Sequence, residues 1–234
     1  DSVMLGMTVI QRSSFYGAPW LAALIGASHA TGPTFAQACA TSARVIASAA
    51  AAVELGDAAA VLAVACDRTS NGPHLYYPDP TAPGGTGASE NAVLDAFNRD
   101  PWATNAMIET AENVAKEAGF TKEQQDEVAL LRYQQYQAAL ADDRAFQRRY
   151  MAPITLRRGK KEIGKVEADE GIHPTTQEGL AKLAPVVPGG SVSFGSQTHP
   201  ADGNAGLVIT SEGRARELSA KPEVRVRVVA AAEA

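Results

Sequence analysis

Residues 34–67, TFAQACATSARVIASAAAAVELGDAAAVLAVACD, carry the pattern that decides the fold. A short extended stretch leads to Cys39, an Ala-rich run continues to Leu55, and the apolar run AAAVLAVA follows the turn at Gly56 and Asp57. The long run has the length of a helix, whereas the short one has the length and apolar character of a buried strand. This order predicts a helix–strand crossover unit in a layered α/β core.

Small side chains dominate the predicted helix from Ser42 to Leu55, so neighbouring backbones can approach it closely and we expect its whole circumference to be buried. The following strand, 58–65, is expected to be buried on both faces. The remaining predicted elements are strands at 2–11, 191–196, 206–210 and 223–230, a hairpin with solvated cations at 154–166, and helices within 14–32, 104–119, 121–141, 176–183 and 211–218.

Thr121, followed by Lys-Glu-Gln, is the predicted N-cap of the 121–141 helix. Val128, Leu131 and Tyr136 are its expected inward-facing residues. Residues 68–92 are rich in Gly, Pro, Ser, Thr and Asn and are expected to form a loop.

The chemistry of the chain centres on Cys39, where the extended stretch should turn into the helix. Thr41 and Ser42 directly behind it can supply capping hydroxyls. Backbone N–H groups at a helix start are unpaired and carry partial positive charge, so a cysteine there is well placed to act as a nucleophile. The alternative is a small apolar residue packed at a strand–helix junction. Cys66, which closes the apolar strand, is expected to pack in the core.

Composition narrows the class of protein. The 234 residues are 45% hydrophobic and 20% charged, as in globular proteins, and the net charge of -5 argues against nucleic acid as a partner. Two cysteines are too few for a disulfide framework and indicate thiols in a reducing compartment. The longest apolar run, 45–66, contains Glu54 and Asp57, so no membrane partner is expected. These features predict a cytoplasmic protein.

No metal site is expected, because the cysteines are far apart and the four histidines show no ligand spacing. The four are His29, His74, His173 and His199.

Several motifs, in order, resemble the thiolase family over nearly the whole chain. CATS at 39–42 resembles the family's nucleophile motif, and ACDRTS at 65–70 stands where thiolases have Gly-Gly-x-Glu-x-Met-Ser, with Asp67 in the acidic place. The other motifs are TAENVA at 110–115, TKEQQD at 121–126, DE at 169–170, LAKLAP at 180–185, and 190–203 with its final Asp-Gly.

The resemblance implies an α/β fold, a thiolase-like layered α-β-α core with an inserted loop domain. The core would comprise 1–67 and 201–220, the loop domain 68–200, and 221–234 would begin a further domain that is missing here. The resemblance also implies that the chain is incomplete at both ends.

The activity that this resemblance implies is that of an acyl-CoA C-acyltransferase. Cys39 would take an acyl group from a CoA thioester and pass it to or from acetyl-CoA, which in reverse cleaves a 3-oxoacyl-CoA. CoA thioesters are then substrates, and no covalently bound cofactor is expected. By position in the motifs, the residues expected to contact CoA are Met107, His173, Phe194 and Thr198. A homodimer or homotetramer is also implied.

In the family the activating histidine and the second catalytic cysteine lie in a C-terminal domain whose motifs this sequence lacks, so this segment alone is expected to be inactive. A non-catalytic thiolase-like subunit with an assembly or binding role is the alternative. It is motivated by Ala36, Ser42 and Ala106, which stand where thiolases have asparagine, glycine and histidine. A ketosynthase-like enzyme of the same fold is disfavoured by the thiolase-type stretch 110–126.

Overall fold

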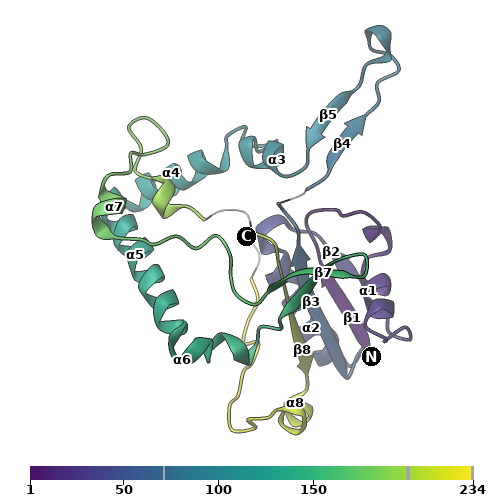
Figure 1. The fold of residues 1–234 in the computed structure, drawn as a ribbon. Helices are drawn as coiled ribbons and strands as arrows, with labels where there is room; N and C mark the ends of the chain where they lie inside the picture. The colour runs from purple at the N-terminus through teal and green to yellow at the C-terminus, as the bar shows by residue number, and fades with distance from the viewer. Residues whose placement is uncertain (71, 199–200, 233–234) are drawn as a thin grey trace. The chain divides into compact units, whose positions relative to one another are not determined.

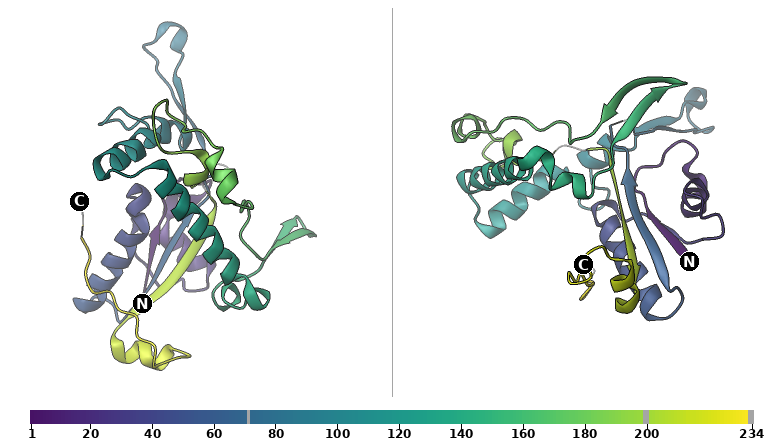
Figure 2. Two further views of the ribbon diagram at one scale, coloured as in Figure 1. Left: turned by 90° about the vertical axis from the view of Figure 1, so that its left-hand side faces the viewer. Right: turned by 60° about the horizontal axis from the view of Figure 1, so that its bottom comes forward.

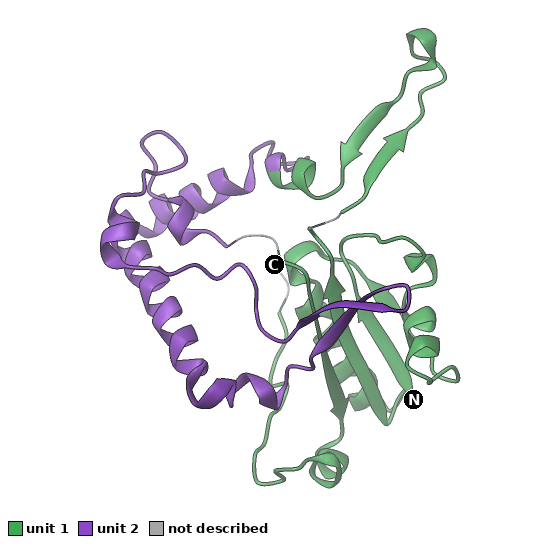
Figure 3. Ribbon diagram, viewed as in Figure 1, with its two compact units in different colours: residues 1–97, 200–234 green, residues 98–199 purple. Residues whose placement is uncertain are grey.

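The computed structural model describes residues 1–70, 72–198 and 201–232. The chain divides into two compact units, unit 1 with residues 1–97 and 200–234, and unit 2 with residues 98–199 (Figure 3). Each unit is described by itself.

A four-stranded sheet forms the centre of unit 1. It comprises β1 (Ser2–Gly6), β2 (Thr34–Phe35), β3 (Ala60–Asp67) and β8 (Gly203–Thr210), in the order β2-β1-β3-β8 (Figure 1). The strand β1 pairs in parallel with both β2 and β3, whereas β8 pairs with β3 in the antiparallel direction. The carboxyl ends of the three parallel strands therefore lie at the same end of the sheet.

Two helices cover opposite faces of this sheet (Figure 2). Helix α2 (Thr41–Glu54) packs on one face and α1 (Ala18–Leu24) on the other. Successive strand residues alternate between faces, so each central strand contributes to both clusters. The first cluster contains Met4, Val45, Ala49, Ala58, Val61 and Ala63, and the second contains Val3, Ala22 and Ala30. The predicted layered α-β-α core is confirmed.

The expected burial of α2 on all sides is wrong. Only Thr41, Val45 and Ala49, spaced four residues apart, are buried. A helix touches a sheet along one stripe, and within the described residues no other element covers the opposite side of α2. Likewise, β3 is fully buried only at Val61 and Ala63, both of which face α2.

A hairpin replaces part of the loop that was expected at 68–92. Its strands are β4 (His74–Tyr77) and β5 (Ala88–Asn91), and α3 (Leu94–Asn98) follows. The Asn91 side chain accepts hydrogen bonds from the N–H groups of residues 93 and 94 and so starts the helix. The turn-rich composition obscured these strands because each has only four residues.

The last part of unit 1 departs from the prediction in two places. The strand β8 is longer than expected and mostly exposed, because it lies at the edge of the sheet; Leu207 and Val208 face solvent. No strand forms at 223–230, where the described backbone pairs with no sheet edge. The helix expected at 211–218 is confirmed as α8 (Glu212–Leu218), capped by Ser211.

Unit 2 is built mainly from helices. They are α4 (Met107–Ala118), α5 (Lys122–Ala139), α6 (Ala141–Arg144) and α7 (Gln177–Ala181). The Thr121 hydroxyl accepts from Gln124 N–H and the Gln124 side chain accepts from Thr121 N–H, so the predicted capping box is confirmed. The inward positions expected on α5 are wrong at Val128 and Leu131, which are exposed.

The predicted hairpin at 154–166 is confirmed as β6 (Ile154–Arg158) and β7 (Lys161–Val166), with exposed cations. The strand expected at 191–196 is wrong, because the 3-10 helix η5 (Phe194–Ser196) occupies its second half. The Ser193 hydroxyl accepts from Gly195 N–H and so caps that helix turn.

Polar contacts hold unit 2 together, since its buried apolar residues among those described are only Ala115, Leu180 and Val192. The Glu112 carboxylate on α4 accepts hydrogen bonds from Ser191 N–H at 2.9 Å and Val192 N–H at 2.8 Å. Burial raises the pKa of Glu112, but these bonds and that of the Ser191 hydroxyl outweigh it and hold the pKa below its ordinary value.

Gly6→Ala should destabilise the chain by about 1–3 kcal/mol, because the new methyl group would lie 2.8 Å from side-chain atoms of Thr41 and Val45. Gly206→Ala is the matched control on the same sheet, since its methyl group meets no atom nearer than 3.8 Å. Urea unfolding of the two variants measures the difference. Equal midpoints would contradict the tight contact at Gly6.

Glu112→Gln should lower the Tm by about 3–8 °C at neutral pH, because the amide replaces an acceptor of several hydrogen bonds. The lowered pKa means that this stabilisation is present above the ordinary pKa of a glutamate and is lost as the pH falls through the folded-state value. The difference in Tm should therefore shrink in acid. Glu117→Gln on the same helix is the control, and an equal effect there would refute the role of Glu112.

Candidate active site

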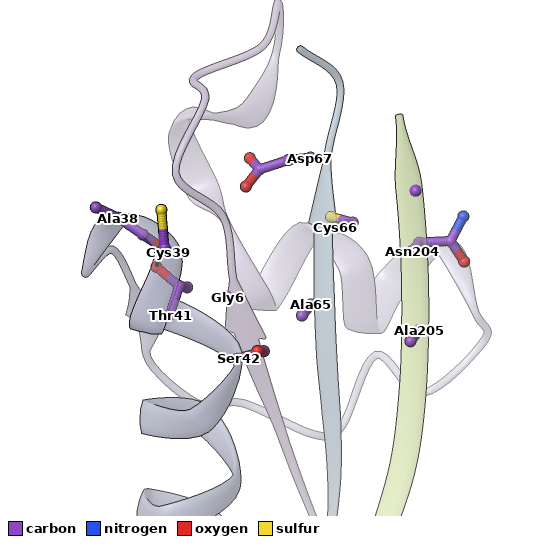
Figure 4. A pocket seen from close by; sticks show the side chains of 11 residues that line it. Gly6, Ala38, Cys39, Thr41, Ser42, Ala65, Cys66, Asp67, Asn204 and Ala205 are labelled. Atoms are coloured by element: carbon purple, nitrogen blue, oxygen red, sulfur yellow. Dashed lines mark hydrogen bonds between the residues drawn. The ribbon is translucent and has the colours of Figure 1, made fainter. Parts of the chain in front are cut away.

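A pocket of about 370 Å³ lies at the carboxyl ends of the parallel strands (Figure 4). Gly6 at the end of β1, the turn at 38–42, the end of β3 and the start of β8 line it. Crevices at the carboxyl ends of parallel strands are where open α/β sheets bind ligands.

Cys39 lies in this pocket and is exposed. It is the middle residue of the 3-10 turn η2 (Ala38–Ala40), which runs directly into α2. The alternative that Cys39 is a packed apolar residue is therefore wrong. The 14-residue helix α2 begins two residues after Cys39, and the N–H groups of its first turn have no carbonyl partner within the helix.

The turn before α2 is held in a way that the sequence did not predict. The Thr41 side chain does not cap the first N–H groups of α2. It bonds to earlier residues instead: its hydroxyl accepts from Gln37 N–H at 2.7 Å and donates to the Ala38 carbonyl at 2.7 Å. Ala38 has a φ of 45°, in the left-handed region, which costs a residue with a side chain roughly 1–2 kcal/mol. The residue before the cysteine is thus strained.

Asp67, at the end of β3, ties the chain that follows β1 to this edge. Its Oδ1 accepts from Thr8 N–H at 2.9 Å and from Val9 N–H at 2.7 Å. Figure 4 shows the carboxylate extending from β3 toward the turn that carries Cys39. The motif at 65–70 marked Asp67, whereas nothing in the sequence marked Thr8.

Cys66 is half-buried, so the expectation that it packs fully in the core is only partly met. Strand alternation places it on the face opposite to Ala65 and Asp67. Burial, and after it the negative charge of Asp67, raise the pKa of the Cys66 thiol above its ordinary value. Its partial burial also makes Cys66 less accessible than the exposed Cys39.

A second carboxylate joins the two strands that border the pocket. Asp202 accepts from the Ser70 hydroxyl at 2.6 Å and from Ser70 N–H at 2.9 Å. The hydroxyl bond, and next the N–H bond, hold the pKa of Asp202 below its ordinary value. The chain that leaves β3 and the chain that enters β8 are thereby fastened to each other.

The described residues that line the pocket place no histidine beside Cys39. Among its described lining residues the only titratable groups are Cys39, Cys66 and Asp67. Within the described ranges, no group of three or more His, Cys, Asp or Glu side chains is arranged to hold a metal ion. His199 lies outside the described residues.

The residues expected to contact CoA all belong to unit 2, whereas Cys39 belongs to unit 1. Met107 is the first residue of α4 and is 49% exposed, and Phe194 opens η5 and is 75% exposed. His173 is an exposed residue of the loop before α7, and Thr198 follows η5. They come from three separate segments of unit 2.

No helix in the described part of the chain combines the length and the apolar character that crossing a membrane requires.

A family model described as "Thiolase, N-terminal domain" matches residues 1–213. The chain belongs to the thiolase family. It is 32% identical over 197 residues to a beta-ketoadipyl-CoA thiolase of Acinetobacter baylyi, covering 80% of this chain and 48% of that protein. It is 38% identical over 144 residues to an acetyl-CoA acetyltransferase of Allochromatium vinosum, covering 61% of this chain and 35% of that one. This thiolase chain thus spans about half or less of these relatives.

Solved thiolase structures share its fold. The acetyl-CoA acetyltransferase of Bacillus anthracis matches with a TM-score of 0.81 and 29% identity, over 93% of this chain and 55% of that chain. Human mitochondrial 3-ketoacyl-CoA thiolase in complex with CoA matches with a TM-score of 0.80 and 26% identity, over 93% and 54%. The family resemblance seen in the sequence motifs is confirmed.

The two thiols should react at different rates with iodoacetamide. We expect Cys39 to be alkylated first, because it is exposed, while the raised pKa of Cys66 and its partial burial delay the second addition. The rate at Cys66 should still be rising at pH values where an ordinary thiol has levelled off. Peptide mapping by mass spectrometry gives both rates, and in urea they should become equal. Equal rates in the folded chain would contradict this assignment.

Proposed function

We propose that this chain provides the acyl-accepting half of a thiolase-type acyltransferase, with Cys39 as the residue that carries the acyl group. The observation that supports it most is the exposed Cys39 in a pocket at the carboxyl edge of the sheet, at the start of α2, in a chain of the thiolase family. Its substrates would be CoA thioesters, as the names of the relatives suggest for those proteins.

The proposed step is a thioester exchange. The Cys39 sulfur attacks the acyl carbon of the CoA thioester, a new carbon–sulfur bond forms, and the bond to the CoA sulfur breaks, with CoA leaving as the thiol. The thiol proton of Cys39 balances the one that CoA takes up. The unpaired N–H groups at the start of α2 favour negative charge as it develops beside Cys39.

The acyl group would then pass to or from the α-carbon of acetyl-CoA, as in 3-oxoacyl-CoA synthesis or cleavage. Unit 2 would supply the surface for CoA. The exposed side chains of Met107 and Phe194 offer apolar contact area, and His173 and Thr198 offer polar groups. A homodimer or homotetramer in the cytoplasm is part of the same proposal.

A non-catalytic thiolase-like subunit is the second candidate. The absence of a histidine among the described residues that line the pocket favours it. The two candidates differ in one measurable property. A catalytic cysteine forms an acyl thioester, whereas a structural one does not.

Incubation of the chain with acetyl-CoA should add one acetyl group at Cys39 without continued turnover, because the described residues that line the pocket place no histidine beside the thiol. Intact mass and peptide mapping locate the group, and hydroxylamine should remove it, as expected of a thioester.

Cys66→Ser is the control and should still be acetylated, whereas Cys39→Ala should not. Acetylation of Cys66 with Cys39 untouched would overturn the proposal. A chain that takes up no acetyl group, although Cys39 reacts readily with iodoacetamide, would favour the non-catalytic subunit.

A further inference from the structure

The hydroxyl of Thr8 makes contacts that the proposed acyl transfer does not use. Its Oγ1 lies 3.1 Å from the Thr41 Oγ1 and 3.3 Å from the Ala38 carbonyl oxygen. The backbone N–H of the same residue donates to Asp67 Oδ1 at 2.9 Å. Thr8 therefore connects the end of β3 to the turn that carries Cys39.

Proton counting assigns the direction of these bonds. A threonine hydroxyl has one proton to donate. Thr41 makes its shorter contact as a donor to the Ala38 carbonyl, at 2.7 Å, and it also accepts from Gln37 N–H. In the contact between the Thr8 and Thr41 hydroxyls, Thr8 is therefore the donor. Its proton is shared between Thr41 Oγ1 and the Ala38 carbonyl oxygen.

Two of these bonds end on Ala38, the residue before the proposed nucleophile. Ala38 has a φ of 45°, and its carbonyl receives both threonine hydroxyls. A backbone in that region persists where the surroundings hold it. The hydroxyls of Thr8 and Thr41 stabilise this conformation by bonding to the Ala38 carbonyl. The Asp67 carboxylate in turn fixes the backbone of Thr8 by accepting hydrogen bonds from Thr8 N–H and Val9 N–H.

We propose that Thr8 is a positioning residue for Cys39, and that Asp67, Thr8 and Thr41 form a clasp that keeps the Ala38 turn in its left-handed conformation. Without the Thr8 hydroxyl, Ala38 relaxes and Cys39 is out of its place in the pocket for most of the time. The inference rests on the proposed role of Cys39 as the nucleophile. It adds a residue that touches neither the thiol nor the acyl group.

Thr8 itself is exposed, so its loss empties no core cavity. A role in stability alone would then have a small effect that spreads over the whole chain. A positioning role predicts a local effect on one thiol, without a matching change in Tm.

The test is the rate of Cys39 alkylation by iodoacetamide in the 234-residue chain carrying Cys66→Ser. We expect Thr8→Val to lower this rate about three- to tenfold, the factor that corresponds to one net hydrogen bond. Thr8→Ser, which keeps the hydroxyl, should retain most of the rate.

Thr210→Val is the matched control. Its hydroxyl donates to the Ala59 carbonyl at 2.7 Å at the opposite end of the sheet, so its removal deletes the same kind of bond away from the pocket. The Tm of every variant is measured alongside, and Thr210→Val should leave the Cys39 rate unchanged.

A rescue variant tests the cause. Glycine adopts a φ of 45° without strain, so Ala38→Gly in the Thr8→Val chain should recover much of the lost rate. The inference is overturned if Thr8→Val alkylates as fast as Thr210→Val, or if Thr8→Ser is as slow as Thr8→Val. Iodoacetamide needs no CoA, so a failure of acetyl transfer would leave this result intact, and the reverse also holds.

Discussion

The close approach of α2 to β1 at Gly6 is the contact on which the rest of unit 1 depends. A methyl group at that position would lie 2.8 Å from side-chain atoms of Thr41 and Val45, so only glycine allows α2 to pack this closely against β1. The start of the helix then reaches the level where the parallel strands end. Cys39, in the turn directly before this helix, lines the pocket there and is exposed.

The core of the fold could be predicted from composition and order alone. An Ala-rich run followed by an apolar run permits few arrangements other than a helix crossing over to a buried strand, and α2 and β3 appear as expected. The helix starts at Thr121 and Ser211 were also predictable, because a capping hydroxyl works through its nearest neighbours in the chain. Cys39 could be singled out because its place depends on the same local order.

Features that depend on contacts between residues far apart in the sequence could not be predicted from it. Thr8 bonds to residues about 30 and 60 positions away, and no local pattern distinguishes it from any other exposed threonine. Thr41 was expected to cap the helix ahead of it but instead turns back to Ala38, since the strained turn offers a closer partner. Exposure on the outer side of α2 was misjudged because a run of small apolar residues does not say which of its faces finds a neighbour.

The antiparallel direction of β8 means that the chain returns to the sheet at the edge where it left. Asp67 pairs with Gly203, and Asp202 fastens the returning chain to Ser70 just beyond β3. The intervening polypeptide is therefore attached at two adjoining points, and closing a longer loop between such points costs only slightly more entropy. Insertions and deletions between these anchors could accumulate during evolution without disturbing the strands beneath. The same architecture can thus keep the turn that carries Cys39 constant while the segment between β3 and β8 diversifies.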